Sequence, residues 1–390
     1  MPRKPNINYE FVDTPEGLDR LVNTFDSREL LAIDLEADSM FHFQDRVCLI
    51  QLATRQQIFI IDPIRLECID RLKPYFNDNR IRKVFHGADY DIRSLFRDFD
   101  IVIHNLFDTE LACRFLGIQQ SGLDAVIQSF FQVKLEKKYQ KKDWSRRPLP
   151  GDMINYAAKD VQYLLRLAEI LEEKLIQKNR LSWVEEECRL LSKVRPNTNP
   201  DVPLYQNFRG AGKLNSRELA ILEEVLLWRR ETARKKDRPL FKIIGNQHIQ
   251  KLVHKKPRSK EELVESKSLS SKQLHMFGHQ LLEAIERGYN MPEDRLPVYP
   301  RRRTPRISEA TSRKVRKLKN WKEAKAKKLS IDPALVLNKT QIVEIAKTRP
   351  VNVQDLSRIN AIKAWQVREF GDEIIRCLNG SQDSRGRGAK

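Results

Sequence analysis

The stretch that decides the fold is Leu30-Leu-Ala-Ile-Asp-Leu-Glu36, in which an apolar run ends in two acidic residues. A short apolar run of this kind favours a buried β-strand. Residues i and i+2 of a strand point to the same face, so Asp34 and Glu36 are expected to project together. Two like charges side by side cost free energy unless a cation joins them. The stretch therefore predicts a cation site or, in the simpler interpretation, a solvated strand end.

More apolar runs follow this strand. Residues 47–53 and 58–62 lie close behind residues 30–34, and this closeness predicts hairpin-like antiparallel pairing. Residues 83–85 and 100–103 are predicted as two further strands, each followed by a helical pattern. Strands mixed with helices indicate an α/β or α+β domain with a mixed sheet.

A strongly periodic helix is predicted from Asp152 to Leu175, with Asp152 as its N-cap. Spacing of four places Tyr156 and Asp160 on one face of this helix. Taken alone, Tyr156 is more simply explained as a core aromatic. Its acidic neighbour favours a functional role.

Another acidic segment, His86-Gly-Ala-Asp-Tyr-Asp91, comes directly after the predicted strand at 83–85. It supplies Asp91, and the apolar residues that follow can pack behind it. Asp89 is only two positions away and is the rival acid.

Two proline-containing segments, 194–205 and 288–306, are predicted to be linkers. The sequence after the first linker repeats itself: a shift of 93 positions superimposes Trp228 on Trp321 and Phe277 on Phe370, with several apolar positions, a proline and a glycine. Such a repeat indicates two copies of one small helical domain. The expected domains are residues 1–205, 206–291 and 306–380, followed by a disordered tail at 381–390.

The charge of the chain is unevenly distributed. Its 72 Lys and Arg against 53 Asp and Glu give a net charge of +19. Residues 1–200 hold 30 basic and 31 acidic residues, whereas residues 201–390 hold 42 basic and 22 acidic residues. This asymmetry predicts a polyanionic partner for the second half, the alternative being a merely soluble basic region.

Several classes of protein are disfavoured. No apolar run approaches the roughly 18–20 residues that span a bilayer, so no membrane partner is expected, and the N-terminus does not resemble a secretory signal. The five cysteines are scattered and form no CxxC pair, which favours a reducing cytoplasm. The phosphate-binding pattern GxxxxGK[ST] is absent, as are HExxH and GxSxG.

Residues 137–147, KKYQKKDWSRR, interleave two aromatic residues with six basic ones. Trp144 could stack on a base, and Arg146 and Arg147 could contact phosphates of a single strand. The alternative is a solvated loop whose tryptophan packs inward.

Together, Asp34-x-Glu36, His86…Asp91 and Tyr156-x-x-x-Asp160 resemble the tyrosine-containing branch of the four-carboxylate 3′-to-5′ exonuclease superfamily. The stretches around residues 49–52, 61–63, 106–109 and 143–149 are similar to ribonuclease D. The duplicated unit resembles the HRDC domain, a helical nucleic-acid-binding module. The resemblance covers roughly residues 8–380.

This resemblance implies an α/β fold, an RNase H-like mixed-sheet exonuclease domain, followed by two all-α HRDC-like domains. It makes four carboxylates the ligands of two divalent metal ions, Mg²⁺ or Mn²⁺, and favours Asp91 over Asp89. Tyr156 would orient the attacking water, because a neutral phenol is a poor base near pH 7. Asp108 is expected to cap a helix that begins near Thr109. The metal ligands would be Asp34, Glu36, Asp91 and Asp160, and the substrate contacts His86, Trp144, Arg146 and Arg147.

The implied activity is that of a cytoplasmic 3′-5′ exoribonuclease that releases nucleoside 5′-monophosphates. Its expected substrates are tRNA precursors with 3′ extensions, and other stable RNAs. The residues themselves do not select RNA over DNA, so a DNA 3′-5′ exonuclease is one alternative. A non-catalytic RNA-binding protein on a nuclease scaffold is the other.

Overall fold

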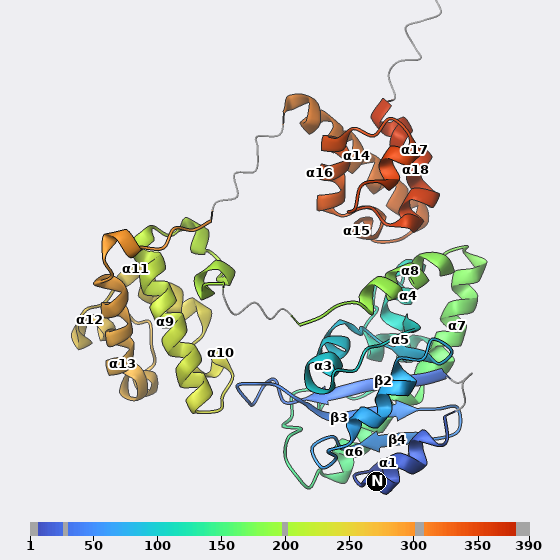
Figure 1. The fold of residues 1–390 in the computed structure, drawn as a ribbon, viewed down its shortest axis with the longest axis horizontal. Helices are drawn as coiled ribbons and strands as arrows, with labels where there is room; N and C mark the ends of the chain where they lie inside the picture. The colour runs from blue at the N-terminus through green and yellow to red at the C-terminus, as the bar shows by residue number, and fades with distance from the viewer. Residues whose placement is uncertain (1–6, 26–29, 197–201, 301–307, 380–390) are drawn as a thin grey trace, which may run out of the picture. The chain divides into compact units, whose positions relative to one another are not determined.

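The computed structural model describes residues 7–25, 30–196, 202–300 and 308–379. Its chain divides into two compact units (Figure 1). Unit 1 comprises Met1–Glu36, Val47–Pro196 and Pro305–Lys390, and unit 2 comprises Ala37–Arg46 and Asn197–Thr304. The predicted tail at 381–390 lies outside the described residues, as do parts of both predicted linkers.

A six-stranded mixed sheet forms the base of unit 1, with the strand order β1-β4-β3-β2-β5-β6. β3 and β4 pair antiparallel, β1 is parallel to β4, and β5 is parallel to both β2 and β6. All seven residues of β3 are buried, which suits a strand in the interior of the sheet. The predicted mixed sheet is confirmed. The strands are β1 (Glu10–Val12), β2 (Leu30–Ala37), β3 (Val47–Ala53), β4 (Ile58–Ile61), β5 (Arg82–Phe85) and β6 (Leu106–Asp108).

The strand predicted at 100–103 is wrong. Asp100 adopts a left-handed conformation with φ 52° and ends a helix, and the strand begins later, at Leu106. Ile101 and Ile103 are nevertheless fully buried. Their apolar alternation therefore reports burial in the core, without backbone pairing.

The helices of this sheet domain (the described residues 7–25, 30–36 and 47–196) cover the sheet and carry much of its core. The main ones are α1 (Pro15–Val22), α3 (Asp89–Phe99), α4 (Thr109–Leu116), α5 (Leu123–Phe131), α6 (Gly151–Gln162), α7 (Leu164–Gln177) and α8 (Leu181–Leu191). The short helices η1 (Ile69–Leu72) and α2 (Lys73–Phe76) lead into β5. α6 packs against β3 and β4.

The single helix predicted from Asp152 to Leu175 is two helices, α6 and α7, separated at Tyr163. A break of one residue leaves the apolar periodicity on both sides intact, so the pattern does not reveal it. The N-cap is Pro150 rather than Asp152, and the carbonyl of Pro150 accepts from the amide of Met153 at 2.9 Å. Asp152 lies in the first turn, where an acid is also favourable.

Five helices follow in the C-terminal part of unit 1, which we call repeat 2. They are α14 (Glu309–Leu329), α15 (Pro333–Val336), α16 (Lys339–Thr348), α17 (Val353–Ser357) and α18 (Ala364–Asn379). Repeat 2 packs on the sheet domain through α8, where Trp183 stacks on Trp365 with ring centroids 4.8 Å apart. Glu186 of α8 accepts from the backbone amides of Ala364 and Trp365 at 2.7 and 2.9 Å, which satisfies the start of α18.

The end of α4 also lies against repeat 2. Gly117 ends this helix with φ 88°, and a Cβ there would approach the carbonyl oxygen of Ser330 to 2.0 Å. Only glycine fits this approach. Arg180 joins the same two segments, because its guanidinium donates to the carbonyls of Phe115 and Leu329 at 2.7 and 2.8 Å.

Unit 2 contains the first helical repeat, repeat 1, together with the loop 37–46. Its helices are α9 (Ser216–Lys235), α10 (Leu240–Ile243), α11 (Asn246–Lys255), α12 (Lys260–Glu265) and α13 (Ser271–Tyr289). Each of these helices begins 93 residues before its counterpart in repeat 2, which confirms the predicted duplication. Within the unit, Asp237 accepts from the backbone amide of Phe43 at 3.1 Å and lies 2.6 Å from His42 Nδ1.

Short 3₁₀ helices flank repeat 1. These are η2 (Leu204–Asn207), η3 (Ala211–Lys213) and η4 (Glu293–Arg295). Among the described residues, no helix has the length and apolar character needed to cross a bilayer.

Candidate active site

Asp34 and Glu36 lie on β2 as the spacing predicts. Both are half-buried, whereas Leu35 between them is buried. Burial raises the pKa of Asp34 from 3.8 to about 6. Burial also raises the pKa of Glu36 well above its ordinary value, and the charges of Asp34, Asp160 and Asp91 raise it further. The two side chains therefore lie in an acidic environment that extends beyond β2.

The acid from α3 is Asp91, in the first turn of that helix. It is buried, and its pKa is raised by burial first and then by the charges of Asp34 and Asp108. Asp89 faces elsewhere: its side chain is 58% exposed and forms an ion pair with Arg93 at 2.8 Å. In the structure Asp91 therefore lies near Asp34, whereas Asp89 forms an ion pair with Arg93 at the surface.

α6 contributes Tyr156 and Asp160, which are both buried on one face of the helix. The two side chains hydrogen-bond each other. Burial raises the pKa of the Tyr156 phenol, with further increases from Asp160, Glu36 and Asp34. Burial and the charge of Asp34 likewise raise the pKa of Asp160. Each of the five predicted residues therefore lies within electrostatic range of at least two of the others, although they come from three separate elements.

These four carboxylates form no ion pair with any of the described residues. Burying unpaired carboxylates together is unfavourable, so the donor set suits hard divalent cations, which prefer carboxylate oxygens. As the side chains stand, no three Asp, Glu, His or Cys residues among the described ones are grouped closely enough to hold a metal ion.

Asp108 holds the backbone near this acidic cluster. It is the N-cap of α4, where its side chain accepts from the amides of Glu110 and Leu111 at 2.8 and 3.2 Å. It also accepts from the amides of Gly87 and Ala88 at 3.0 and 2.9 Å, just before α3. The predicted cap is confirmed, and the same side chain positions the helix that carries Asp91.

His86 lies beside Asp108 at the end of β5. Its Nδ1 is 2.9 Å from Thr109 Oγ1, and its Nε2 is buried with no hydrogen-bond partner in the structure. Burial lowers the pKa of the ring, so the neutral form is favoured. This environment suits a residue that supports the backbone around α3 and α4, and it gives no sign of the predicted substrate contact.

Two of the residues that were predicted to contact the substrate instead pack inside the fold. Trp144 is fully buried and lies against Tyr156 with ring centroids 6.2 Å apart, so its faces are not available to a base. Arg147 forms a bidentate pair with Asp62, with nitrogen–oxygen distances of 2.5 and 2.7 Å, and also donates to the carbonyls of Trp144 and Cys48. The inward-packing alternative holds for both side chains.

Arg146 is the predicted contact that stays at the surface. Its side chain is 80% exposed, and its Nε donates to Asp143 at 3.0 Å. The Asp62–Arg147 pair is a feature that the sequence does not predict. The only available signal was an acid and a base 85 positions apart, and nothing local connects them.

Comparisons with known proteins agree with this arrangement. The 3′-5′ exonuclease family matches residues 9–176, and the HRDC domain matches residues 218–285 and 313–378. A ribonuclease D from Bartonella henselae is 28% identical over 380 residues, which are 96% of this chain and 91% of that protein.

Two solved structures are also similar. The catalytic core of RRP6 from Trypanosoma brucei is 35% identical, with a TM-score of 0.62 over 72% of this chain and 79% of that one. The exoribonuclease RNase D from Escherichia coli has a TM-score of 0.73 over 95% of this chain and 99% of that one. Because the identity is 24%, this second similarity shows a shared fold alone.

Proposed function

The chain belongs to the ribonuclease D family of 3′-5′ exonucleases, and we propose that it shortens RNA from the 3′ end, one nucleoside 5′-monophosphate at a time. The observation that carries the proposal is the convergence of four carboxylates, two buried and two half-buried, and one buried tyrosine. They come from β2, α3 and α6, and none of the four carboxylates forms an ion pair with a described residue.

We assign Asp34, Glu36, Asp91 and Asp160 to hold divalent metal ions, two in number. When bound, such a pair of ions would supply a water of lowered pKa and positive charge for the departing 3′ oxygen. The fit rests on the donor set: four carboxylates that form no ion pair with a described residue have the charge to balance two dications.

We assign Tyr156 to orient the attacking water. Its raised pKa keeps the phenol protonated at neutral pH, so it can donate a hydrogen bond but cannot act as the base. Asp160 accepts from this hydroxyl in the structure, so the phenol oxygen is left to accept a hydrogen bond from the water. The contacts with Tyr139 and Trp144, at ring-centroid distances of 5.6 and 6.2 Å, hold the ring from the other side.

The proposed substrates are RNAs with 3′ extensions, tRNA precursors among them. Support comes from the names of the similar proteins and from the charge of the second half, with 42 basic against 22 acidic residues. A structured RNA offers many phosphates to such a surface. The choice of RNA over DNA rests on the family to which the chain belongs.

The decisive experiment is digestion of matched, 5′-labelled oligomers by the full-length protein, with products separated at nucleotide resolution. We expect a ladder that shortens from the 3′ end of a 3′-extended tRNA in Mg²⁺, and no cleavage in excess chelator. Nucleoside 5′-monophosphates should be the small products. Endonucleolytic fragments, or equal cleavage with chelator, would refute the proposal. Faster digestion of the DNA oligomer would identify DNA, and not RNA, as the preferred substrate.

A further inference from the structure

The two helical repeats contain the same pair of aromatic rings. Trp228 of α9 lies edge-on to Phe277 of α13, with centroids 5.7 Å apart at 74°. Trp321 of α14 and Phe370 of α18 repeat this geometry at 5.9 Å and 72°. Both members of the pair are shifted by 93 positions. The surroundings of the two tryptophans can therefore be compared residue by residue.

In repeat 2 a carboxylate bridges the donors around this ring pair. Trp321 Nε1 donates to Glu373 at 3.2 Å, and Lys325 Nζ donates to the other oxygen of Glu373 at 2.6 Å. The Lys325 ammonium also lies 5.4 Å from the centroid of the Phe370 ring. Repeat 2 thus contains an anion-binding arrangement that is filled by its own glutamate.

In repeat 1 the carboxylate is missing. The position of Glu373 is occupied by Gln280, and that of Lys325 by Thr232. Trp228 is 9% exposed, and its Nε1 is buried without a hydrogen-bond partner among the described residues. A buried N–H without an acceptor costs free energy, and Trp144 and Trp183 have one as well, but Trp228 alone of the three lines a cavity beside an ammonium.

A cation is nevertheless present at the equivalent ring of repeat 1. Lys236, one turn beyond Thr232 along α9, places its ammonium 5.8 Å from the centroid of Phe277. It forms no ion pair with any described residue. Repeat 1 therefore keeps an indole N–H and an ammonium beside the aromatic pair, and lacks the anion that joins them in repeat 2.

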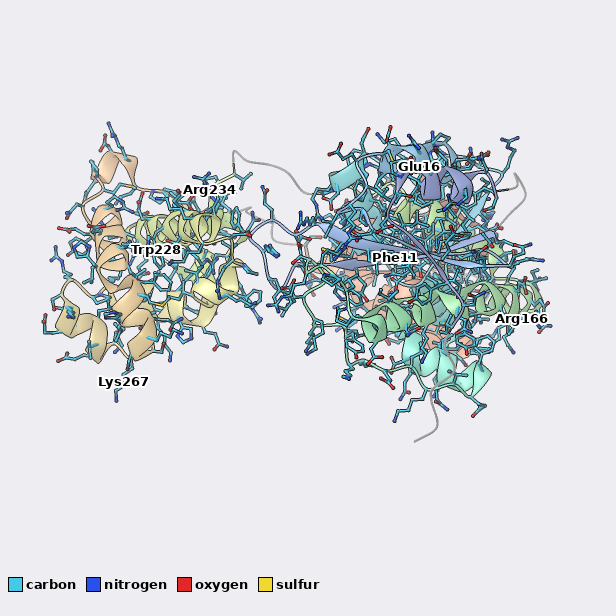
Figure 2. All side chains as sticks on the ribbon, turned by 90° about the horizontal axis from the view of Figure 1, so that it is seen from below. Phe11, Glu16, Arg166, Trp228, Arg234 and Lys267 are labelled. Carbon is cyan, nitrogen blue, oxygen red and sulfur yellow. The ribbon has the colours of Figure 1, made fainter. Side chains whose placement is uncertain are left out.

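An open cavity of about 670 Å³ lies at this place, between α9 and α13. Trp228, Thr232, Lys236 and Gln280 line it, together with Lys235 and Arg287. Its two acids already have partners: Glu231 pairs with Arg234 at 3.0 Å and with Lys235 at 3.5 Å, and Glu283 lies 3.3 Å from His279. Figure 2 shows Trp228 on α9 within this unit.

We propose that this cavity of repeat 1 binds a backbone phosphate of the RNA substrate. The phosphate oxygens take the place that the Glu373 carboxylate has in repeat 2, accepting from the Trp228 indole, the Lys236 ammonium and the Gln280 amide. Charge favours this occupant, because residues 206–291 hold 18 Lys and Arg against 10 Asp and Glu. The inference rests on the proposed function in one respect, namely that the polyanion is RNA.

The two repeats then differ in role. Repeat 2 satisfies its own donors and is packed on α8 through Trp183 and Trp365. Repeat 1 leaves the equivalent donors for a ligand. A single exchange, Gln280→Glu, gives repeat 1 the internal carboxylate of repeat 2 and should close the site.

The test is RNA binding by the full-length protein in excess chelator, where hydrolysis does not interfere. Fluorescence anisotropy with a labelled 3′-extended tRNA compares the wild type, Gln280→Glu and Lys267→Gln. The last variant is the charge-matched control: Lys267 is exposed, lies away from Trp228 in Figure 2, and its replacement also lowers the net charge by one.

We expect Gln280→Glu to weaken binding roughly tenfold, the scale of a lost charge-assisted contact. Its plot of log affinity against log salt should also become flatter, by about 0.7–0.9 for one lost phosphate contact. Lys267→Gln should change affinity less than about twofold. If circular dichroism shows that Gln280→Glu does not fold, Lys236→Gln, at an exposed position, takes its place with the same expected result.

Equal affinities for Gln280→Glu and Lys267→Gln would overturn the inference and leave the exonuclease proposal intact. A wild-type protein that digests RNA but does not bind it in chelator would overturn the inference as well. Failure of the wild type to digest RNA in Mg²⁺, with binding still lost in Gln280→Glu, would instead refute the proposed function while supporting this phosphate site.

Discussion

The sheet domain contains two sets of charged side chains in its interior, and the two sets differ in whether their partners come from the chain itself. One set is satisfied by the chain itself. Asp62 is fully buried against the Arg147 guanidinium, and the ammonium of the buried Lys83 donates to the carbonyls of Asp78 and Ile81 at 2.6 and 2.7 Å. The other set, Asp34, Glu36, Asp91 and Asp160, forms no ion pair with any described residue.

This difference separates structure from function. A buried charge with a partner in the same chain can be explained by folding alone. Four carboxylates with raised pKa values lower the stability of the metal-free protein near neutral pH, and a cation from outside the chain would offset their charge. The comparison predicts opposite consequences when each set is mutated.

The largest effect is expected on catalysis, from a change within one turn of α3. Asp91→Asn should lower kcat/KM by about 10³-fold or more, beyond the 10–100-fold that is typical for residues that only support metal ligands. Asp89→Asn removes the same charge two residues earlier from an exposed pair with Arg93, and should stay within about twofold of wild type. Initial rates on a labelled oligomer measure both. Equal losses would remove the distinction between the two acids.

Removing a partner from the charged side chains that are paired within the chain should lower the stability of the fold. Arg147→Met leaves Asp62 buried without its partner, so we expect a loss of about 3 kcal/mol in the free energy of unfolding. Urea denaturation followed by circular dichroism measures it, with Arg146→Met as the exposed neighbour that should change little. A stable Arg147→Met protein with weakened RNA binding would show instead that Arg147 contacts phosphate.

A smaller effect is expected from the phenol. Tyr156→Phe removes the hydroxyl that orients water and should lower kcat by about 10–100-fold, with KM nearly unchanged. Tyr139→Phe is the matched control, because its ring contacts Tyr156 at 5.6 Å. The raised pKa of Tyr156 means that its ionisation does not limit activity below pH 10. A fall in activity near pH 9 that is absent from Tyr156→Phe would contradict this role.

The smallest effect is a gain in stability. In chelator at pH 7.5, Asp34→Asn should raise the free energy of unfolding by about 1–2 kcal/mol, because it relieves the like-charge cluster. The folded-state pKa of Asp34 is raised from 3.8 to about 6, so the folded protein binds more protons between these values and loses stability as the pH rises through that window. The gain should therefore be smaller at pH 4.5. Equal or lower stability at pH 7.5 would contradict the account.

The sequence predicts those features of this site that depend on local spacing. Asp34 and Glu36 share a face because strands have period two, Tyr156 and Asp160 because helices have period 3.6, and Asp108 caps α4 because it precedes a helical pattern. The duplication of the helical domain can be predicted because both copies lie in one chain, so the sequence can be compared with itself.

Other features depend on contacts between distant segments. The aromatic and basic residues in the segment 137–147 are as compatible with a nucleic-acid contact as with buried packing and a buried ion pair. Only the fold shows that Trp144 packs on Tyr156 and that Arg147 reaches Asp62. The apolar residues Ile101 and Ile103 are buried as predicted, but no local signal shows that their backbone lies outside the sheet.

The most direct measurement of the central claim is a calorimetric titration of the chelator-stripped, full-length protein with Mn²⁺, in the absence of RNA. The account predicts binding of two ions to wild type and to Asp89→Asn, and loss of that binding in Asp34→Asn and Asp91→Asn. Undiminished binding of Mn²⁺ to Asp34→Asn and Asp91→Asn would contradict it.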